Sequence, residues 1–129
     1  MNLVDSSGWL EYFSDGANAT AFERVLTNTE NLLVPTLCLY EVFKVVLRER
    51  GENEALQAVA LMRQGSIVEL TAEIALLAAR TSLDFRIPMA DSVILATGLL
   101  HKAVVWTQDA DFKDVKGVKY IPRAGKEDK

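Results

Sequence analysis

Short apolar runs alternate with helix-forming segments along this chain, and that alternation constrains its fold more than any other feature. The runs that predict strands lie at 2–5, 32–34, 67–70, 104–106 and 118–121. Strand runs that alternate with helices are typical of a parallel sheet covered by helices on both faces. We therefore predict an α/β fold with a central parallel sheet. The 129 residues are enough for one domain, which we place at 1–125, followed by a flexible C-terminal tail at 126–129.

The segments between these runs carry helix signals. Helices are predicted over 9–13, 19–26, 36–50, 53–63, 74–83 and 89–102. The hydroxyl groups of Ser6, Ser7, Thr36 and Thr71 stand where N-caps are expected, and Gly51 stands where a helix should end. Residues 109–112 are predicted to form a short turn or helix.

The charge balance limits the kinds of partner. A net charge of −4 and a pI near 5.0 argue against binding nucleic acid through bulk positive charge. A metal ion at an acidic site would still supply local positive charge for a phosphate. Half of the lysines and arginines lie in the last quarter of the chain, where they form either a phosphate-contacting flank or a solubilising tail.

Cysteine and histidine are too few for several kinds of site. Cys38 and His101 are single in the sequence, which excludes a disulfide framework, a thiolate zinc site and a histidine-rich metal cluster. The chain enters an apolar run within its first residues, which leaves no room for a cleavable leader. The apolar stretches fall short of the roughly 18 residues that span a bilayer. We therefore expect a cytoplasmic protein with no membrane partner.

Four carboxylates stand where apolar runs give way to a helix or a turn. They are Asp5, Glu41, Asp91 and Asp109. Because the carboxyl ends of parallel strands meet at one edge of a sheet, side chains far apart in sequence would gather there into one anionic pocket.

Each acid also has a simpler explanation. Asp5 would cap a helix, and Glu41 would pair with Lys44 one turn further on. The helix dipole favours an acid at Asp91 without any function. Asp109, and Asp111 two residues later, would serve as turn formers.

Taken together, the acids predict a divalent-cation site. Clustered carboxylates raise one another's pKa unless a cation neutralises them. Oxygen ligands without histidine or thiolate suit Mg²⁺ or Mn²⁺, which keep several of their waters. Such a metal lowers the pKa of a bound water and directs it at a phosphodiester.

Four segments resemble the PIN-domain ribonucleases of the VapC toxin type. They are Val4-Asp5-Ser6-Ser7, Leu39-Tyr40-Glu41-Val42, Met89-Ala90-Asp91 and the run from Trp106 to Phe112. Each segment is weak alone, but their order, their spacing and the chain length make the resemblance specific over nearly the whole chain.

The resemblance implies a three-layer α/β/α fold and Mg²⁺- or Mn²⁺-dependent hydrolysis of single-stranded RNA. It makes Asp5, Glu41, Asp91 and Asp109 the acidic quartet, with Asp5 and Asp91 as the main metal ligands. Asp111 competes with Asp109 for the fourth place. The resemblance also implies that Ser6 and Thr107 support the acids or a water, that the protein is a homodimer, and that a small antitoxin blocks its active site.

Two other functions are alternatives for this sequence. A PIN-like module that binds RNA or protein without catalysis would take up no metal. A phosphotransferase that uses Asp5 as its nucleophile would form an acid-labile aspartyl phosphate. The sequence lacks the second nearby aspartate of dehalogenase-like phosphatases after Asp5, and all four acids of a nuclease are present.

Overall fold

The computed structural model describes residues 1–124, and within them five parallel strands form one sheet. The strand order is β3-β2-β1-β4-β5, so the first strand of the chain lies at the centre. The strands are β1 Asn2–Val4, β2 Leu32–Pro35, β3 Ser66–Val68, β4 Val104–Thr107 and β5 Val118–Tyr120. The predicted parallel sheet is confirmed. The segment expected as a tail, 126–129, lies outside the described residues.

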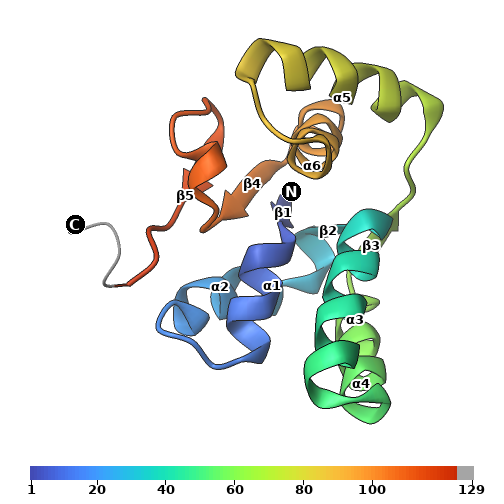
Figure 1. The fold of residues 1–129 in the computed structure, drawn as a ribbon, viewed down its shortest axis with the longest axis vertical. Helices are drawn as coiled ribbons and strands as arrows, with labels where there is room; N and C mark the ends of the chain where they lie inside the picture. Colours follow the sequence, from blue (N-terminus) through green and yellow to red (C-terminus); the bar gives the residue numbers. More distant parts are fainter. Residues whose placement is uncertain (125–129) are drawn as a thin grey trace.

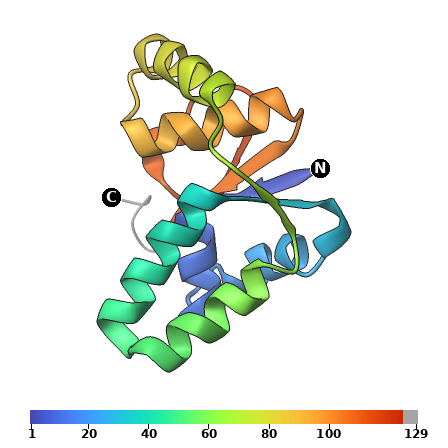
Figure 2. The same ribbon diagram turned by 90° about the vertical axis from the view of Figure 1, so that its right-hand side faces the viewer.

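Six α-helices cover the two faces of this sheet in the described part of the chain (Figure 1). They are α1 Ser6–Phe13, α2 Ala19–Leu26, α3 Thr36–Arg50, α4 Glu52–Met62, α5 Ala72–Phe85 and α6 Met89–Leu100, with short 3₁₀ helices η1 Thr29–Asn31 and η2 Ala110–Phe112. Figure 2 shows α5 and α6 on one side of the sheet and the first four helices on the other. The expected three-layer α/β/α arrangement is confirmed.

Two of the predicted helix starts are corrected. Helix α1 is capped by Asp5, whose side chain accepts from the Gly8 N–H, and not by Ser6 or Ser7. Thr36 is the first residue of α3 and not its cap, because Pro35 stands at the cap position and cannot form a side-chain cap. Thr71 does cap α5, accepting from the Ile74 N–H.

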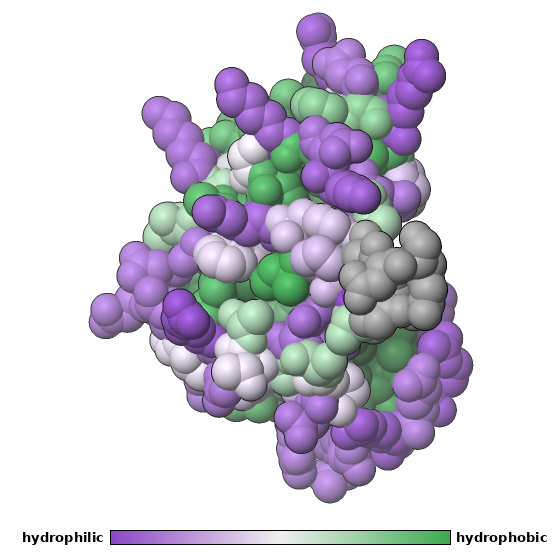
Figure 3. Space-filling model, turned by 90° about the vertical axis from the view of Figure 1, so that its left-hand side faces the viewer, coloured by the Kyte–Doolittle hydropathy of each residue, from purple (hydrophilic) through white to green (hydrophobic). Residues whose placement is uncertain are grey.

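The core is built from the strands and the helix faces that meet them. Leu3, Val4, Val34 and Val105 from the three inner strands are at most 1% exposed. The face drawn in Figure 3 is covered mainly by hydrophilic side chains, with smaller hydrophobic patches between them. No helix within residues 1–124 is both long enough and apolar enough to cross a bilayer.

The close packing of α1 against the sheet depends on Gly8. A Cβ at this position would lie 2.5 Å from Val4 Cγ1 and 2.8 Å from a ring carbon of Phe22. Gly8→Ala should therefore destabilise the fold by about 1–3 kcal/mol through overpacking, although alanine gains about 1 kcal/mol in helix propensity. Urea unfolding measures the change, and a variant as stable as the wild type would contradict the prediction. Val4→Ala makes room for the added Cβ. The double variant should therefore lose less stability than the sum of the losses of the two single variants.

Candidate metal centre

Asp5 is the most buried acid at the carboxyl edge of the sheet. It follows β1 and is 2% exposed. Its Oδ1 accepts from Ser7 Oγ at 2.7 Å and from the Gly8 N–H at 3.1 Å, and its Oδ2 accepts from Thr107 Oγ1 at 2.5 Å. These three donors hold the carboxylate in one orientation.

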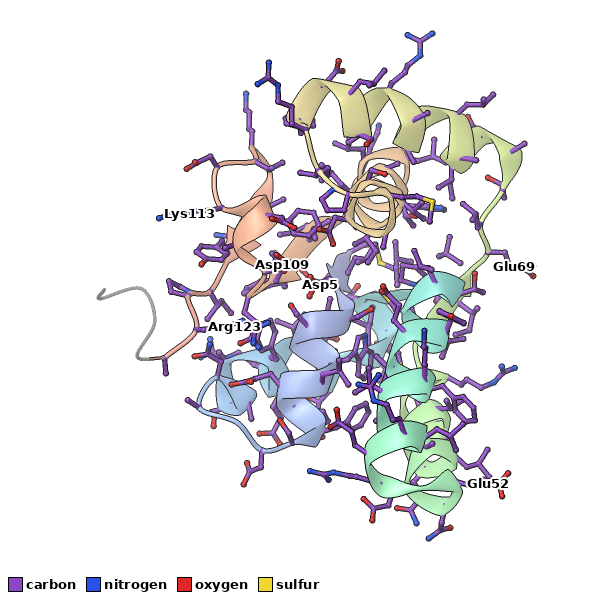
Figure 4. The ribbon with its side chains drawn as sticks, in the orientation of Figure 1. Asp5, Glu52, Glu69, Asp109, Lys113 and Arg123 are labelled. Atoms are coloured by element: carbon purple, nitrogen blue, oxygen red, sulfur yellow. The ribbon has the colours of Figure 1, made fainter. Side chains whose placement is uncertain are left out.

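The hydroxyl group of Thr107 joins Asp5 to the end of β4. Thr107 Oγ1 donates to Asp5 and accepts from the Asp109 N–H at 2.9 Å. Asp109 in turn caps η2, where its Oδ1 accepts from the Asp111 N–H at 2.9 Å. In Figure 4 the labelled Asp5 and Asp109 lie next to each other, at the centre of the molecule.

Three further carboxylates approach one another closely. One oxygen from each of Asp91, Asp109 and Asp111 lies within 4.8 Å of the other two. Asp91 reaches this edge because it lies in the first turn of α6, whose far end leads into the start of β4. The sequence left Asp109 and Asp111 as competitors for one place, and the structure brings both to Asp91.

The negative charges in this cluster are not compensated. Burial, together with the neighbouring charges of Asp109, Asp111 and Asp5, raises the pKa of Asp91 to about 8. Burial also raises the pKa of Asp5 to about 6, against the lowering effect of its hydrogen bonds. The ion pairs found within residues 1–124 lie on α3 and α4, where they join Arg48 to Glu49 and Arg50 to Glu54.

Glu41 on α3 is held by a residue of α1. Its Oε1 accepts from Ser6 Oγ at 2.6 Å, so α1 positions it from the residue that follows Asp5. The pairing with Lys44 that the sequence offered is replaced, because Lys44 Nζ donates to the Tyr40 hydroxyl at 3.4 Å. Glu41 does not belong to the three acids within 4.8 Å of one another.

Cys38 lies close enough to both Glu41 and Asp5 for each carboxylate to affect its thiol. Burial raises the pKa of this thiol, and the charges of Asp5 and Glu41 both raise it further. Its Sγ donates to the Val4 carbonyl at 3.9 Å. The two acids therefore flank the same buried position at the ends of β1 and β2.

The predicted residues thus include one group of neighbouring acids and two hydroxyl residues that donate hydrogen bonds to acids. Asp91 and Asp109 lie together with Asp111, while the charge of Asp109 raises the pKa of Asp5 and the charge of Asp5 raises that of Asp91. Ser6 donates to Glu41 and Thr107 donates to Asp5, which are contacts of the supporting kind that the resemblance implied. The donor set is made of oxygens alone, and burial together with neighbouring carboxylates raises the pKa values of Asp5 and Asp91. Both properties fit a hard divalent cation such as Mg²⁺ or Mn²⁺.

Two residues of this region were not identified from the sequence. Ser7 was read only as a helix cap, yet its hydroxyl donates to Asp5. Gln108 was not considered, although it is 2% exposed and lies between Thr107 and Asp109. Ser7 could have been found from its place in the first turn after Asp5. Gln108 could not, because its side-chain partners Glu11 and Asn18 lie 97 and 90 residues away.

A family model for the PIN domain matches residues 3–118, which is most of the sequence. The chain therefore belongs to the PIN-domain family. Comparison with curated protein sequences finds no match.

Solved structures of similar fold include several toxins. A toxin–antitoxin complex from Klebsiella pneumoniae superposes with a TM-score of 0.76 at 21% identity, covering 92% of this chain and 95% of the other. The sarcin–ricin loop cleaving toxin VapC20 of Mycobacterium tuberculosis gives 0.75 at 18% identity, covering 95% and 100%. DNA-bound VapBC from Salmonella typhimurium gives 0.73 at 14% identity, covering 95% and 98%. At these identities the likeness establishes a shared fold.

Proposed function

We propose that this PIN-domain protein is a Mg²⁺- or Mn²⁺-dependent endoribonuclease of the cytoplasm and the toxin of a toxin–antitoxin pair. The observation that carries the proposal is the approach of Asp91, Asp109 and Asp111 to within 4.8 Å, beside the buried Asp5. A structural role gives no reason to bring this many uncompensated acids to one edge of a sheet.

The residues have separate roles in this proposal. Asp5, Glu41, Asp91 and Asp109 are the proposed metal-binding and catalytic acids, and Asp111 adds a more exposed oxygen beside Asp91. The bound ion supplies a positive charge for the scissile phosphate and lowers the pKa of a water. Asp5 fixes the inner side of the site through its bonds to Ser7 and Thr107. The product would carry a 5′-phosphate.

Phosphotransfer through Asp5 receives no support from its surroundings. An aspartyl nucleophile needs an accessible oxygen, whereas Asp5 is 2% exposed and both its oxygens accept hydrogen bonds. A catalytically silent PIN module is distinguished by metal titration, since it would take up neither Mg²⁺ nor Mn²⁺.

RNA cleavage tests the proposal directly. Purified protein should cleave single-stranded RNA with Mg²⁺ or Mn²⁺ and stop when EDTA removes the metal. Asp5→Asn and Asp91→Asn should both lose this cleavage, measured on end-labelled RNA in a gel. Equal activity in the wild type and both variants would reject the assignment. Cleavage that survives EDTA would reject its metal dependence.

The toxin role is supported by the fold neighbours that are themselves toxin–antitoxin proteins. Induced expression should arrest bacterial growth, and expression of Asp91→Asn to the same level should not. The proposed antitoxin is a small protein, which we expect to be encoded next to this chain and to restore growth when it is co-expressed. If the wild type and Asp91→Asn both arrested growth, toxicity would not depend on the carboxylate site.

A homodimer is proposed from the outer face of α5. Leu76 and Leu83 on this helix are 72% and 81% exposed, and Met89 nearby in sequence is 77% exposed. Water-facing leucines seven residues apart share one helix face, which a second copy would cover. Leu83→Glu should convert a dimer into a monomer in sedimentation velocity. Leu56→Glu, on the 54% exposed leucine of α4, should leave the dimer intact.

A further inference from the structure

A second hydrogen-bonded cluster of side chains lies next to the proposed metal-binding acids and shares no residue with them. It consists of Gln108 after β4, Glu11 on α1 and Asn18 before α2, and we call it the Gln108 cluster. The Gln108 side chain is 2% exposed. An amide buried to this extent is costly unless its donors and acceptor are all satisfied.

Gln108 meets that requirement fully. Its Nε2 donates to Glu11 Oε1 at 3.1 Å and to the Ser7 carbonyl at 3.5 Å, and its Oε1 accepts from Asn18 Nδ2 at 3.0 Å. The other Glu11 oxygen accepts from the Asn18 N–H at 2.8 Å, and Asn18 Nδ2 also donates to the Pro122 carbonyl at 2.9 Å. The cluster thus ties α1, the turn before α2 and the C-terminal segment to the end of β4.

The turn before α2 holds Glu11 closely. A Cβ on Gly16 would lie 2.4 Å from the carboxylate carbon of Glu11, so the turn backbone passes directly against this group. The Gly16 N–H also donates to the Glu11 carbonyl at 3.0 Å. Glu11 is therefore a fixed partner for Gln108 and not a freely moving surface acid.

Gln108 is also linked to the proposed metal site on both sides. Its backbone N–H donates to Ser7 Oγ at 3.2 Å, and the same hydroxyl donates to Asp5 Oδ1 at 2.7 Å. In the sequence it stands between Thr107, which donates to Asp5, and Asp109, which approaches Asp91. A shift of Gln108 would therefore change the position of Asp109 relative to both Asp5 and Asp91.

We propose that Gln108 is a positioning residue for the divalent cation: its bonds to Glu11 and Asn18 fix Asp109 relative to Asp5 and thereby set the metal affinity. This proposal rests on the proposed metal-dependent function and names a determinant of it outside the acids. Groups that orient metal ligands in this way change metal affinity by about 10- to 100-fold when they are removed.

An exchange of the amide and the carboxylate tests this role. Gln108→Glu places a second carboxylate against Glu11 and should weaken Mn²⁺ binding about tenfold or more, measured by isothermal titration calorimetry. The double variant with Glu11→Gln restores one N–H···O bond between the two side chains. Its Mn²⁺ affinity should return to within about threefold of the wild type.

Two control variants separate positioning from general effects. Gln64→Glu makes the same charge change on an exposed glutamine after α4 and should bind Mn²⁺ as the wild type does. Val46→Ala opens the core on α3, at a residue 7% exposed, and should lower the melting temperature without weakening Mn²⁺ binding. A purely structural role for Gln108 would make Gln108→Glu behave like Val46→Ala.

The outcomes distinguish this proposal from the function on which it rests. A wild type that takes up no Mn²⁺ would overturn both. A folded Gln108→Glu with wild-type affinity, or a double variant as weak as the single one, would overturn the positioning role alone. If Gln108→Glu does not fold, Glu11→Gln takes its place, with an expected loss of Mn²⁺ affinity of about tenfold. An unchanged affinity in that variant would also overturn the positioning role.

Discussion

Asp91→Asn is expected to lower RNA cleavage by about a hundredfold or more and, at the same time, to make the metal-free protein more stable. The two effects have one cause. Burial and the charges of Asp109, Asp111 and Asp5 raise the pKa of Asp91 from its ordinary 3.8 to about 8. The carboxylate that would bind a cation is therefore unfavourable in the fold that lacks one.

The pH dependence gives the sign of the stability effect. Because the pKa of Asp91 is higher in the folded than in the unfolded chain, its contribution to stability is lost as pH rises from about 4 through about 8. Asparagine has no proton to lose. The melting temperature of metal-free Asp91→Asn should therefore exceed that of the wild type increasingly between pH 5 and pH 8, as measured by circular dichroism with EDTA present.

Added metal should reverse this order. Mn²⁺ stabilises the folded state in proportion to its affinity, so the wild type should gain more in melting temperature than Asp91→Asn. Asp114→Asn, which neutralises an exposed acid shortly after η2, should match the wild type in cleavage and in its response to Mn²⁺. A less stable metal-free Asp91→Asn would contradict the proposed electrostatic cause.

Thr107→Val should be the most damaging single change of equal volume near the site. The Thr107 side chain is fully buried, and its hydroxyl donates to Asp5 and accepts from the Asp109 N–H. Valine would leave a buried carboxylate and a backbone N–H without these partners, at a cost of about 2–4 kcal/mol. The melting temperature should fall by roughly 10 °C, and RNA cleavage should fall with it.

A serine at the same position provides the matched control. Thr107→Ser keeps the hydroxyl and loses one methyl group, so most of the Mn²⁺ affinity and cleavage should survive. Its remaining loss of stability, about 1 kcal/mol, reports the missing methyl alone. If Thr107→Ser were as inactive as Thr107→Val, packing rather than the hydrogen bonds would position Asp5 and Asp109.

The parts of the fold that could be predicted from sequence are those encoded locally. Apolar runs gave the strands and their parallel arrangement, because strands buried on both faces carry such runs. The same runs predict that Asp5, Asp91 and Asp109 gather at one edge of the sheet. The sequence left the N-cap of α1 open between Asp5, Ser6 and Ser7, because all three side chains offer an oxygen and only the backbone geometry selects Asp5.

The finer arrangement of the site depends on contacts between distant segments. Asp109 and Asp111 could not be distinguished from sequence, since both follow β4 and only the turn of η2 brings the two of them to Asp91. The partner of Glu41 was likewise open. A local pairing with Lys44 was available. Instead, Ser6, which lies 35 residues earlier in the chain, donates to Glu41 because α1 packs on α3.

The central place of β1 has a consequence for how this protein is made. Its strand partner β4 begins at residue 104, and the acids of the site come from both ends of the sequence. During translation, β1 cannot pair with β4 until residues 104–107 have been synthesised. Pairings between segments so distant in sequence also form slowly. A nascent chain on the ribosome therefore has no assembled carboxylate cluster. In the proposed function, competence to cut RNA would arrive only after the segment that carries Asp109 has been synthesised.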